Sequence, residues 1–328
     1  MTSRGNAITS FLKENGWNNA QHCPLAADFS SRRYVRLVKS GNQKAILMDA
    51  DSDQKTDIFV GLAKVLRDLE LSAPEIYAAD PDQGLVLMQD FGTRNVGRLL
   101  DQGAEAKPFF LHATDVLTHL HKAFTPALTE NLELPLFTTE AFVTQTKLFL
   151  DAYFPIVTGR VASEEERLSF AQAWQDALSP LDALPQSLLL RDFMPDNLMA
   201  LQNGTLGILD FQDAGIGPVA YDIASLCEDV RRDGGFALLD DVLAHYHATR
   251  ALDPDTNPSA LRSACLLCSA QRHTRVLGII AKRSITQGLC DKFAFLPRIR
   301  HHLSSLFETE TALVPVKNWF NNFDRLLQ

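Results

Sequence analysis

The pattern of hydrophobic and polar positions predicts a strand-rich first part of the chain. Apolar residues at every third or fourth position indicate a helix, and short apolar runs between turn residues indicate strands. By these rules, one short helix ends near Trp17 and a longer one spans residues 56–69. Strands are expected at residues 34–39, 45–48, 76–77 and 85–88.

Helical periodicity dominates the chain from about Thr93 onward. The expected helices span residues 106–124, 139–154, 163–178, 223–231, 237–250 and 259–286, and a short β insert spans residues 187–211. A strand-rich part followed by a run of helices is typical of an α+β protein. We therefore predict a small antiparallel-sheet lobe at residues 1–92 and a larger, mainly helical lobe at residues 93–328.

The β insert carries the most informative chemistry in the sequence. Asn203-Gly204 favours a two-residue type I′ hairpin turn, and counting outward from this turn pairs Asn197 with Asp210. Opposed side chains on paired strands lie ~5 Å apart, and Mg²⁺ prefers such amide and carboxylate oxygens as ligands. Asp192 precedes Asn197 on the entering loop, where a carboxylate could accept a hydroxyl proton beside the metal. An ordinary surface hairpin with polar ends is the alternative interpretation.

The composition argues against several other classes of protein. Hydrophobic residues make up 46% of the 328 positions, and the net charge of −9 disfavours nucleic-acid binding. No apolar run approaches the ~20 residues that cross a membrane, and the N-terminus lacks the apolar core of a signal peptide. Five cysteines are an odd number, so we expect no disulfide framework, packed thiols at Cys265 and Cys268, and a cytoplasmic location.

Several motifs along the chain point to one family. They are Asp28 to Tyr34 (DFSSRRY), Ile46 to Ala50 (ILMDA), Asp192 to Ala224 with its Asp210-Phe211-Gln212 triplet, and Gln271-Arg272-His273. Together they resemble the aminoglycoside phosphotransferase and choline-kinase-like family, over nearly the whole chain. Within that family, the sequence is most similar to the cell-wall amino-sugar kinases, which phosphorylate the anomeric hydroxyl of N-acetylmuramate and N-acetylglucosamine.

The resemblance implies a protein-kinase-like fold and phosphoryl transfer from ATP with Mg²⁺ to a small molecule. It implies that Asp192 is the catalytic base and that Asn197 and Asp210 are the metal ligands. Asp222 would brace the catalytic loop through backbone hydrogen bonds, or serve only as a helix N-cap. The implied nucleotide contacts are Ser30, Ser31, Arg32 and Arg33 in the phosphate loop and Gln89, Asp90 and Phe91 at the hinge.

The sequence departs from the wider family at the phosphate grip. The family places a lysine after an apolar strand, whereas here Ala45-Ile46-Leu47 leads to Met48-Asp49. Guanidinium groups can hold phosphates, so we expect Arg32 or Arg33 to replace that lysine. Successive strand residues point to opposite faces, so at most one of the two should reach the nucleotide.

The sequence constrains the acceptor site least. Candidate acceptor contacts are Asp213, Gln271, Arg272 and Arg275. A cationic helix face would suit a carboxylated sugar such as N-acetylmuramate and would repel a polycationic aminoglycoside; a solvated helix face is the alternative. Aminoglycosides and choline-like alcohols also remain open as acceptors. A catalytically weak, ATP-binding pseudokinase is the alternative from another class.

Overall fold

The computed structural model describes residues 3–25, 32–51, 55–250, 257–290, 292–323 and 325–327. The chain forms two compact units, each assembled from separate segments. The first unit comprises Met1–Glu105, Ala123–Leu134 and Pro195–Asp213, and the second comprises Ala106–Lys122, Pro135–Met194 and Ala214–Gln328. The segment Pro195–Asp213, which contains most of the β insert, therefore belongs to the first unit. In the sequence, this segment comes long after the predicted lobe boundary at residues 92 and 93.

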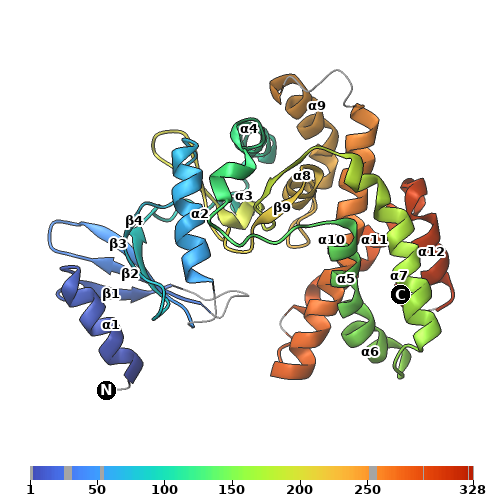
Figure 1. Cartoon of the computed structure of the whole chain (residues 1–328), viewed down its shortest axis with the longest axis horizontal. Helices are drawn as coiled ribbons and strands as arrows, with labels where there is room; N and C mark the ends of the chain where they lie inside the picture. Colours follow the sequence, from blue (N-terminus) through green and yellow to red (C-terminus); the bar gives the residue numbers. More distant parts are fainter. Residues whose placement is uncertain are drawn as a thin grey trace. The chain divides into compact units, whose positions relative to one another are not determined.

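Among the described residues, a five-stranded antiparallel sheet organises the first unit (Figure 1). Its spatial order is β1-β2-β3-β5-β4. The strands are β1 (Gln21–Pro24), β2 (Arg33–Val38), β3 (Lys44–Asp49), β4 (Ile76–Asp80) and β5 (Leu85–Gln89). Strands β2 to β5 confirm the predicted ones. Strand β1 was not anticipated, because it is short, ends in a proline and carries no apolar run.

Helices complete the core of the first unit. Phe11 and Leu12 of the first helix, and Trp17 just after it, are buried together with leucines of β2, β3 and β5. This packing explains why the predicted N-terminal helix and the sheet form together. The helices and short strands that the first unit adds are α1 (Ser3–Glu14), α2 (Thr56–Asp68), α3 (Val96–Asp101), β7 (Leu198–Ala200) and β8 (Leu206–Ile208).

The hairpin of β7 and β8 has a different register from the predicted one. Leu198 pairs with Ile208 rather than with Leu209. The N–H of Leu209 donates to the carbonyl oxygen of Asn197 at 2.9 Å. The prediction that Asn197 lies directly opposite Asp210 is therefore wrong by one residue, and the two are diagonal neighbours across the hairpin.

The turn of this hairpin explains the shift. Leu201 donates its N–H to the Thr205 carbonyl at 3.0 Å, which closes a three-residue loop instead of a two-residue one. Gly204 alone in this loop has a positive φ, at 85°, whereas a type I′ turn needs two such residues. Asn203 instead accepts hydrogen bonds from the backbone N–H and the hydroxyl of Thr205 through its side chain.

The second unit is mainly helical, as predicted from the periodicity (Figure 1). Its helices are α4 (Ala106–Ala123), α5 (Thr139–Leu148), α6 (Phe154–Thr158), α7 (Glu164–Leu178), α8 (Ala220–Cys227), α9 (Leu239–Arg250), α10 (Pro258–Gln287), α11 (Leu296–Thr309) and α12 (Val314–Asn321). Helices α11 and α12, like α3, were not anticipated. The predicted helix at residues 139–154 is interrupted by a π-helical turn, Phe149–Tyr153. Pro155 lacks the N–H that a continuous helix would need there.

Two other predictions in this unit require correction. The segment Gly215–Pro218, expected to be a loop, is strand β9 and pairs antiparallel with β6 (Gln186–Leu189). An added Cβ at Gly215 or Gly217 would lie within 3 Å of Phe137, so both glycines let this ring pack on the strand. Helix α8 also begins three residues before the predicted start and ends at Cys227.

The long helix α10 lies against the π-helical turn in the core of the second unit. A Cβ added to Gly278 would meet the backbone of Leu148 and Phe149 at 2.6–2.7 Å. Cys265 and Cys268 of the same helix are buried free thiols, which confirms the prediction for this C-x-x-C. Close helix packing, rather than redox or metal chemistry, accounts for the small residues along α10.

Gly278→Ala is therefore expected to lower the free energy of unfolding by about 2 kcal/mol, because backbone cannot move aside as a flexible side chain can. Urea unfolding monitored by circular dichroism measures this change. Lys282→Ala is the matched control, since it replaces an exposed residue on the same helix and should change stability by less than ~0.5 kcal/mol. Equal stability of the two variants would contradict the close contact.

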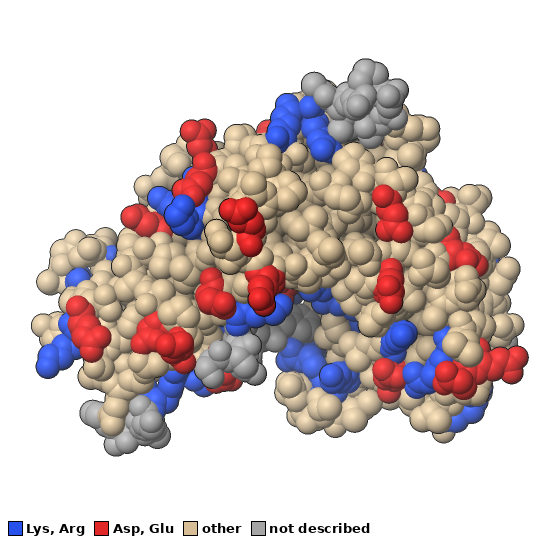
Figure 2. All heavy atoms as spheres, in the orientation of Figure 1, with Lys and Arg blue, Asp and Glu red and all other residues tan. Residues whose placement is uncertain are grey.

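The charge on the surface and the length of the apolar helices indicate which kinds of partner the protein could bind. On the face that Figure 2 shows, acidic and basic side chains of the described residues are interspersed, and no broad basic patch covers it. In the described part of the chain, no helix combines the length and the apolar character that a membrane span requires.

Candidate active site

The loop that carries Asp192 is held by a buried carboxylate of the second unit. Asp222, in the first turn of α8, is fully buried and accepts the N–H of Leu190 at 2.6 Å and the N–H of Arg191 at 2.8 Å. Arg191 has a φ of 67°, a left-handed conformation that costs about 1–3 kcal/mol outside glycine. These hydrogen bonds are those expected of the brace that the family resemblance implies.

The carbonyl oxygen of Arg191 is also held, on the side opposite its N–H. The hydroxyl of Ser225 donates to it at 3.1 Å, and Arg272 Nη1 donates to it at 2.8 Å. Arg272 Nη2 lies 3.9 Å from Asp192 Oδ1, and its guanidinium lies over the Tyr221 ring at 5.0 Å. Arg272 is thus a positioning residue of the Asp192 loop, whatever else it contacts.

Asp192 and Asp222 lie in different environments, one partly exposed and the other buried. Burial raises the pKa of Asp222 to about 7, against the opposing effects of the two N–H donors and of Arg272. Asp192 is different, because 36% of its side chain is exposed. Burial works against the charge of Arg272, but Tyr221 and Asp192 keep the pKa of that guanidinium above its usual value. A solvent-accessible carboxylate beside a fixed cation is suited to accepting a proton from a bound hydroxyl.

The other two predicted acceptor contacts on α10, Gln271 and Arg275, differ in burial. Gln271 is buried, and its amide donates to the Phe142 carbonyl at 3.1 Å, which ties α10 to α5. Arg275 is partly exposed, and burial lowers its pKa, with the charges of Arg191 and Arg272 acting in the same direction. Arg275 therefore belongs to a cluster of three arginines that includes the residues around Asp192.

The predicted metal ligands lie on the β7–β8 hairpin of the first unit. Asp210 has a φ of 60°, so the backbone turns sharply just after β8. Gln212 donates from Nε2 to Asp210 Oδ1 at 2.8 Å, which orients the carboxylate. Between them, Phe211 is fully buried and stacks on Phe59 of α2, with ring centroids 4.9 Å apart. Packing and a hydrogen bond thus hold the segment that follows the hairpin.

The residues of this hairpin fit a magnesium ion by their chemistry. Asn197 and Asp210 offer an amide oxygen and a carboxylate, which are the hard oxygen donors that Mg²⁺ takes. The hydrogen bond between Leu209 and the Asn197 carbonyl joins the two positions directly. In the shifted register Asn197 faces Leu209, so Asp210 is one residue further along the chain than predicted. A one-residue shift changes the face to which a strand side chain points, so the register by itself does not bring the two donors together.

The arginines of the predicted phosphate loop point to different partners. Arg33 donates to Asp49 at 2.9 Å, and Arg4 binds the same carboxylate, which stands near the position where the family has its lysine. Arg32 is buried and acts on the Tyr34 hydroxyl. Burial and the charge of Asp210 raise the pKa of Tyr34 to about 12, and Arg32 opposes this shift. Ser30 and Ser31 lie outside the described residues.

One ion pair between a lysine and an aspartate adds to this part of the first unit. Lys55, in a left-handed conformation at φ 53°, pairs with Asp213 Oδ1 at 3.0 Å. Sequence reasoning missed Lys55, because nothing in its local pattern distinguishes it from other exposed lysines. The described non-glycine residues with positive φ are Asn42, Lys55, Glu70, Arg191 and Asp210; Arg191 is next to Asp192, and Asp210 is a predicted metal ligand. Backbone strain of this kind gathers at functional sites.

The predicted hinge residues are held by the sheet of the first unit. Asp90 binds Arg36 of β2 in bidentate fashion, at 2.6 and 2.9 Å, and accepts the N–H of Gly92. Gln89 donates its N–H to the Glu75 carbonyl at 2.8 Å. Phe91 packs over Gly207 of β8, where an added Cβ would come within 2.7 Å of the ring. These contacts fix the backbone of the predicted hinge within the first unit.

A cavity of ≈ 300 Å³ opens in the first unit beside Gln89 and Phe91. Its other walls come from the end of α2 and from the turn of the hairpin. Neither Arg32 nor Asp210 lines it. This cavity is therefore separate from the residues that the sequence assigned to phosphate and metal.

Comparisons with known proteins identify the family. Residues 22–257 match the phosphotransferase enzyme family. The chain is 30% identical, over 89% of its length and 87% of the relative, to an N-acetylmuramate/N-acetylglucosamine kinase of Neisseria meningitidis serogroup B. It is 28% identical to a kinase of the same name from Caulobacter vibrioides, over 98% of this chain and 97% of that one.

Solved structures show the same fold at low sequence identity. Choline kinase LicA from Streptococcus pneumoniae superposes with a TM-score of 0.64 at 14% identity, covering 93% of this chain and all of that one. The five-stranded antiparallel sheet and the larger helical part thus form a protein-kinase-like fold. The chain belongs to the phosphotransferase enzyme family and is a small-molecule kinase.

Proposed function

We propose that the chain transfers the γ-phosphoryl group of ATP to a hydroxyl of an amino sugar, with N-acetylmuramate or N-acetylglucosamine as the acceptor. The observation that carries this proposal is the similarity, over 89% and 98% of the chain, to two kinases named for these sugars. The spacing of Asp192, Asn197 and Asp210 along the sequence, and the chemistry of their side chains, support phosphoryl transfer itself.

In this proposal, Asp192 orients the acceptor hydroxyl and accepts its proton as the phosphoryl group is transferred. Asp222 accepts hydrogen bonds from the loop backbone, and Ser225 and Arg272 donate to it. These bonds support the role, because they fix the backbone that carries Asp192. Asn197 and Asp210 would hold Mg²⁺, which neutralises charge on the phosphates when it is bound with the nucleotide. The backbone around Gln89, Asp90 and Phe91 would contact adenine.

In this proposal, Arg32 rather than Arg33 contacts the phosphates. Arg32 is buried and interacts with the Tyr34 hydroxyl, whose pKa also responds to the charge of Asp210. Arg33 instead pairs with Asp49, and 61% of its side chain is exposed. We therefore expect Arg32→Ala to raise the KM for ATP about tenfold, the effect of one hydrogen bond to a charged group. Initial-rate kinetics with varied ATP measures this change.

Arg33→Ala is the matched control, because it removes the neighbouring guanidinium while Arg4 still pairs with Asp49. Its KM for ATP should stay within about twofold of that of the unchanged protein. Loss of ATP affinity in Arg33→Ala but not in Arg32→Ala would reverse the assignment. Loss in neither would remove both arginines from the phosphate site.

The charge near Asp192 favours an acidic or neutral acceptor over a cationic one. The charges of Arg191 and Arg272 lower the pKa of Arg275, and the charge of Asp192 acts on both Arg272 and Arg275 in the second unit. Such a cluster would repel an aminoglycoside or choline and would attract the carboxylate of N-acetylmuramate. Arg275 is the partly exposed arginine of this cluster and is therefore the best placed to contact an acceptor. The other proposed acceptor contacts also have partners within the protein; these are Asp213, Gln271 and Arg272.

A coupled assay of ADP release tests the function directly. The acceptor panel is N-acetylmuramate, N-acetylglucosamine, an aminoglycoside and choline, with Asp192→Asn as the inactive control. We expect turnover with the amino sugars and a higher kcat/KM for the carboxylated one. Turnover only with choline or the aminoglycoside would overturn the acceptor assignment. ATP binding without turnover on any acceptor would favour the pseudokinase alternative.

A further inference from the structure

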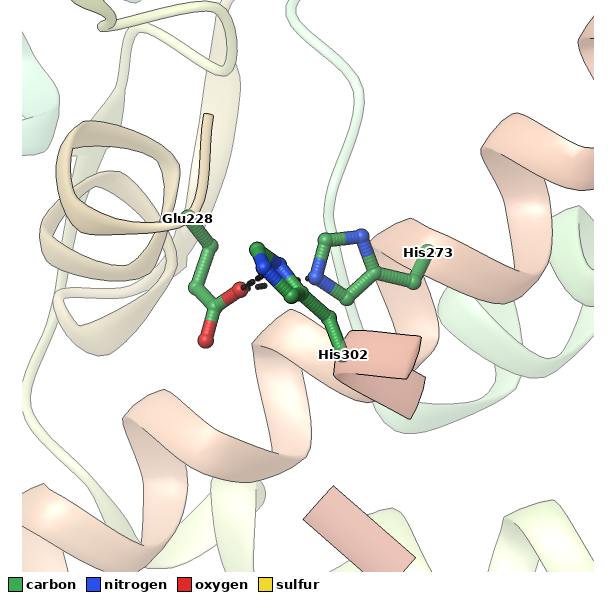
Figure 3. Close-up of side chains that lie close together, drawn as sticks. All are labelled: Glu228, His273 and His302. Atoms are coloured by element: carbon green, nitrogen blue, oxygen red, sulfur yellow. Dashed lines mark hydrogen bonds and ion pairs between the residues drawn. The ribbon is translucent and has the colours of Figure 1, made fainter. Parts of the chain in front are cut away.

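A cluster of two histidines and one glutamate lies in the second unit, outside the residues assigned to phosphoryl transfer (Figure 3). Glu228 ends α8, His273 lies in the middle of α10, and His302 lies on α11. Their ligand atoms all lie within 4.8 Å of one another. His273 Nε2 is 2.8 Å from Glu228 Oε2, and His302 Nδ1 is 3.2 Å from the same oxygen. Three helices thus direct one potential ligand atom each toward a common point.

The cluster combines burial with negative charge. The side chains of Glu228 and His273 are only 3% and 2% exposed, whereas that of His302 is 21% exposed. Burial alone would raise the pKa of Glu228, but the contacts with His273 and His302 outweigh it and lower the pKa to about 2. The carboxylate is therefore charged at neutral pH, and solvent has access from the His302 side.

The other charges near Glu228 have partners of their own. Asp229 pairs with Arg232 at 3.0 Å, and Arg298 pairs with Asp233 while it donates to the Val230 carbonyl. The two histidines are thus the groups that face the Glu228 carboxylate in the described structure. Buried carboxylates are normally paired or bound to a metal.

Only one of the two histidines forms a well-aligned hydrogen bond with Glu228. His273 is aligned to hydrogen-bond Glu228. His302 Nδ1 is buried, and no group in the described part of the chain is aligned with it as a hydrogen-bond partner, in spite of its short distance to the carboxylate. A cation at the centre would satisfy the lone pair of this nitrogen together with those of His273 and Glu228.

We propose that Glu228, His273 and His302 form a binding site for a divalent transition-metal ion, with Zn²⁺ as the best fit. Two imidazoles and one carboxylate are a known zinc donor set. Tetrahedral bonds of ~2.1 Å place ligand atoms ~3.4 Å apart, so the observed spacings of 2.8 and 3.2 Å need only a small expansion. Water would complete the coordination from the exposed His302 side.

A metal bound at this site would help to fix α10 in place. His273 follows Arg272, whose guanidinium holds the Arg191 carbonyl. A metal that joins α8, α10 and α11 would therefore stiffen the helix that supports the Asp192 loop. The proposal concerns binding and does not depend on the acceptor or on the phosphoryl transfer proposed above.

Zinc binding to the full-length protein, after removal of metals with a chelator, tests the proposal. Competition with a chromophoric zinc chelator should report one tightly bound Zn²⁺ per chain, and a hundredfold excess of Zn²⁺ over its Kd should raise the thermal midpoint by about 5 °C. His302→Gln should weaken binding at least ~100-fold. His301→Gln, which changes the exposed histidine next to it, should bind Zn²⁺ like the unchanged protein. Binding should also weaken as the pH falls, because protons compete for the imidazoles.

Cobalt provides a readout that does not depend on a variant that folds. Co²⁺ bound to the unchanged protein should give the intense visible absorption of a four-coordinate site, and Zn²⁺ should displace it. Equal zinc affinity of His302→Gln and His301→Gln, or only the weak spectrum of six-coordinate Co²⁺, would overturn the proposal. The cluster could instead be only an ion pair. In that case the stability of the unchanged protein would depend on pH but not on Zn²⁺, and His302→Gln would abolish the pH dependence. This result would also overturn the proposal.

Discussion

Asp192→Asn is expected to lower kcat about 10³-fold, in the middle of the range for the loss of a general base. The amide preserves the size of the side chain but cannot accept the proton of the acceptor hydroxyl. The affinity for Mg-ATP should change by less than about twofold, because the predicted metal ligands are Asn197 and Asp210. Single-turnover kinetics and equilibrium nucleotide binding measure the two quantities separately.

Asp196→Asn is the matched control for this substitution. It changes a carboxylate of the same loop, also partly exposed, which the sequence does not assign to the chemistry. Its kcat should stay within a few-fold of that of the unchanged enzyme. Turnover of Asp192→Asn at the normal rate would remove Asp192 from the mechanism, and an equal loss in both variants would point to the loop conformation as the cause.

Asp222→Ala is expected to have the largest effect on stability. It removes the acceptor for two buried N–H groups, those of Leu190 and Arg191, and takes away a carboxylate near Arg272. Each unsatisfied buried donor costs about 1–3 kcal/mol, so we expect a loss of about 3 kcal/mol or more in the free energy of unfolding. The turnover of the folded fraction should fall as well, because the strained backbone at Arg191 loses its support.

Ser225→Ala provides the comparison from the same helix. It removes one hydrogen bond to the Arg191 carbonyl, which still accepts from Arg272, and should cost about 1 kcal/mol. Urea unfolding and kcat should therefore rank the unchanged protein first, Ser225→Ala second and Asp222→Ala last. If Asp222→Ala keeps normal stability, its two hydrogen bonds do not brace the loop.

The sequence predicted the elements well where the pattern is local. The apolar stripe of α2 and the period of α10 depend on neighbouring residues, so their extents agree with prediction to within a residue or two. Short or irregular elements were missed or misjudged. Strand β9 was taken for a loop, because its glycines signal turns locally and their fit against Phe137 is a long-range contact.

The candidate site shows the same division. The D-x-x-x-x-N spacing and Asp210 are visible in the sequence. Strand alternation also predicts that at most one of Arg32 and Arg33 reaches the nucleotide. The structure shows that the two arginines have different partners, because Asp49 binds Arg33. The hairpin register could not be obtained by counting, since the turn type depends on which residue takes positive φ.

By itself, the sequence determined the order of strands and helices, the family resemblance and the identity of the catalytic and metal-binding candidates. These depend on local periodicity and on spacing along the chain. Only the tertiary structure decided which groups brace the Asp192 loop, which arginine has a buried place near Asp210, and that Glu228, His273 and His302 meet. Such contacts join residues far apart in the chain, and their geometry is set by how helices and strands pack.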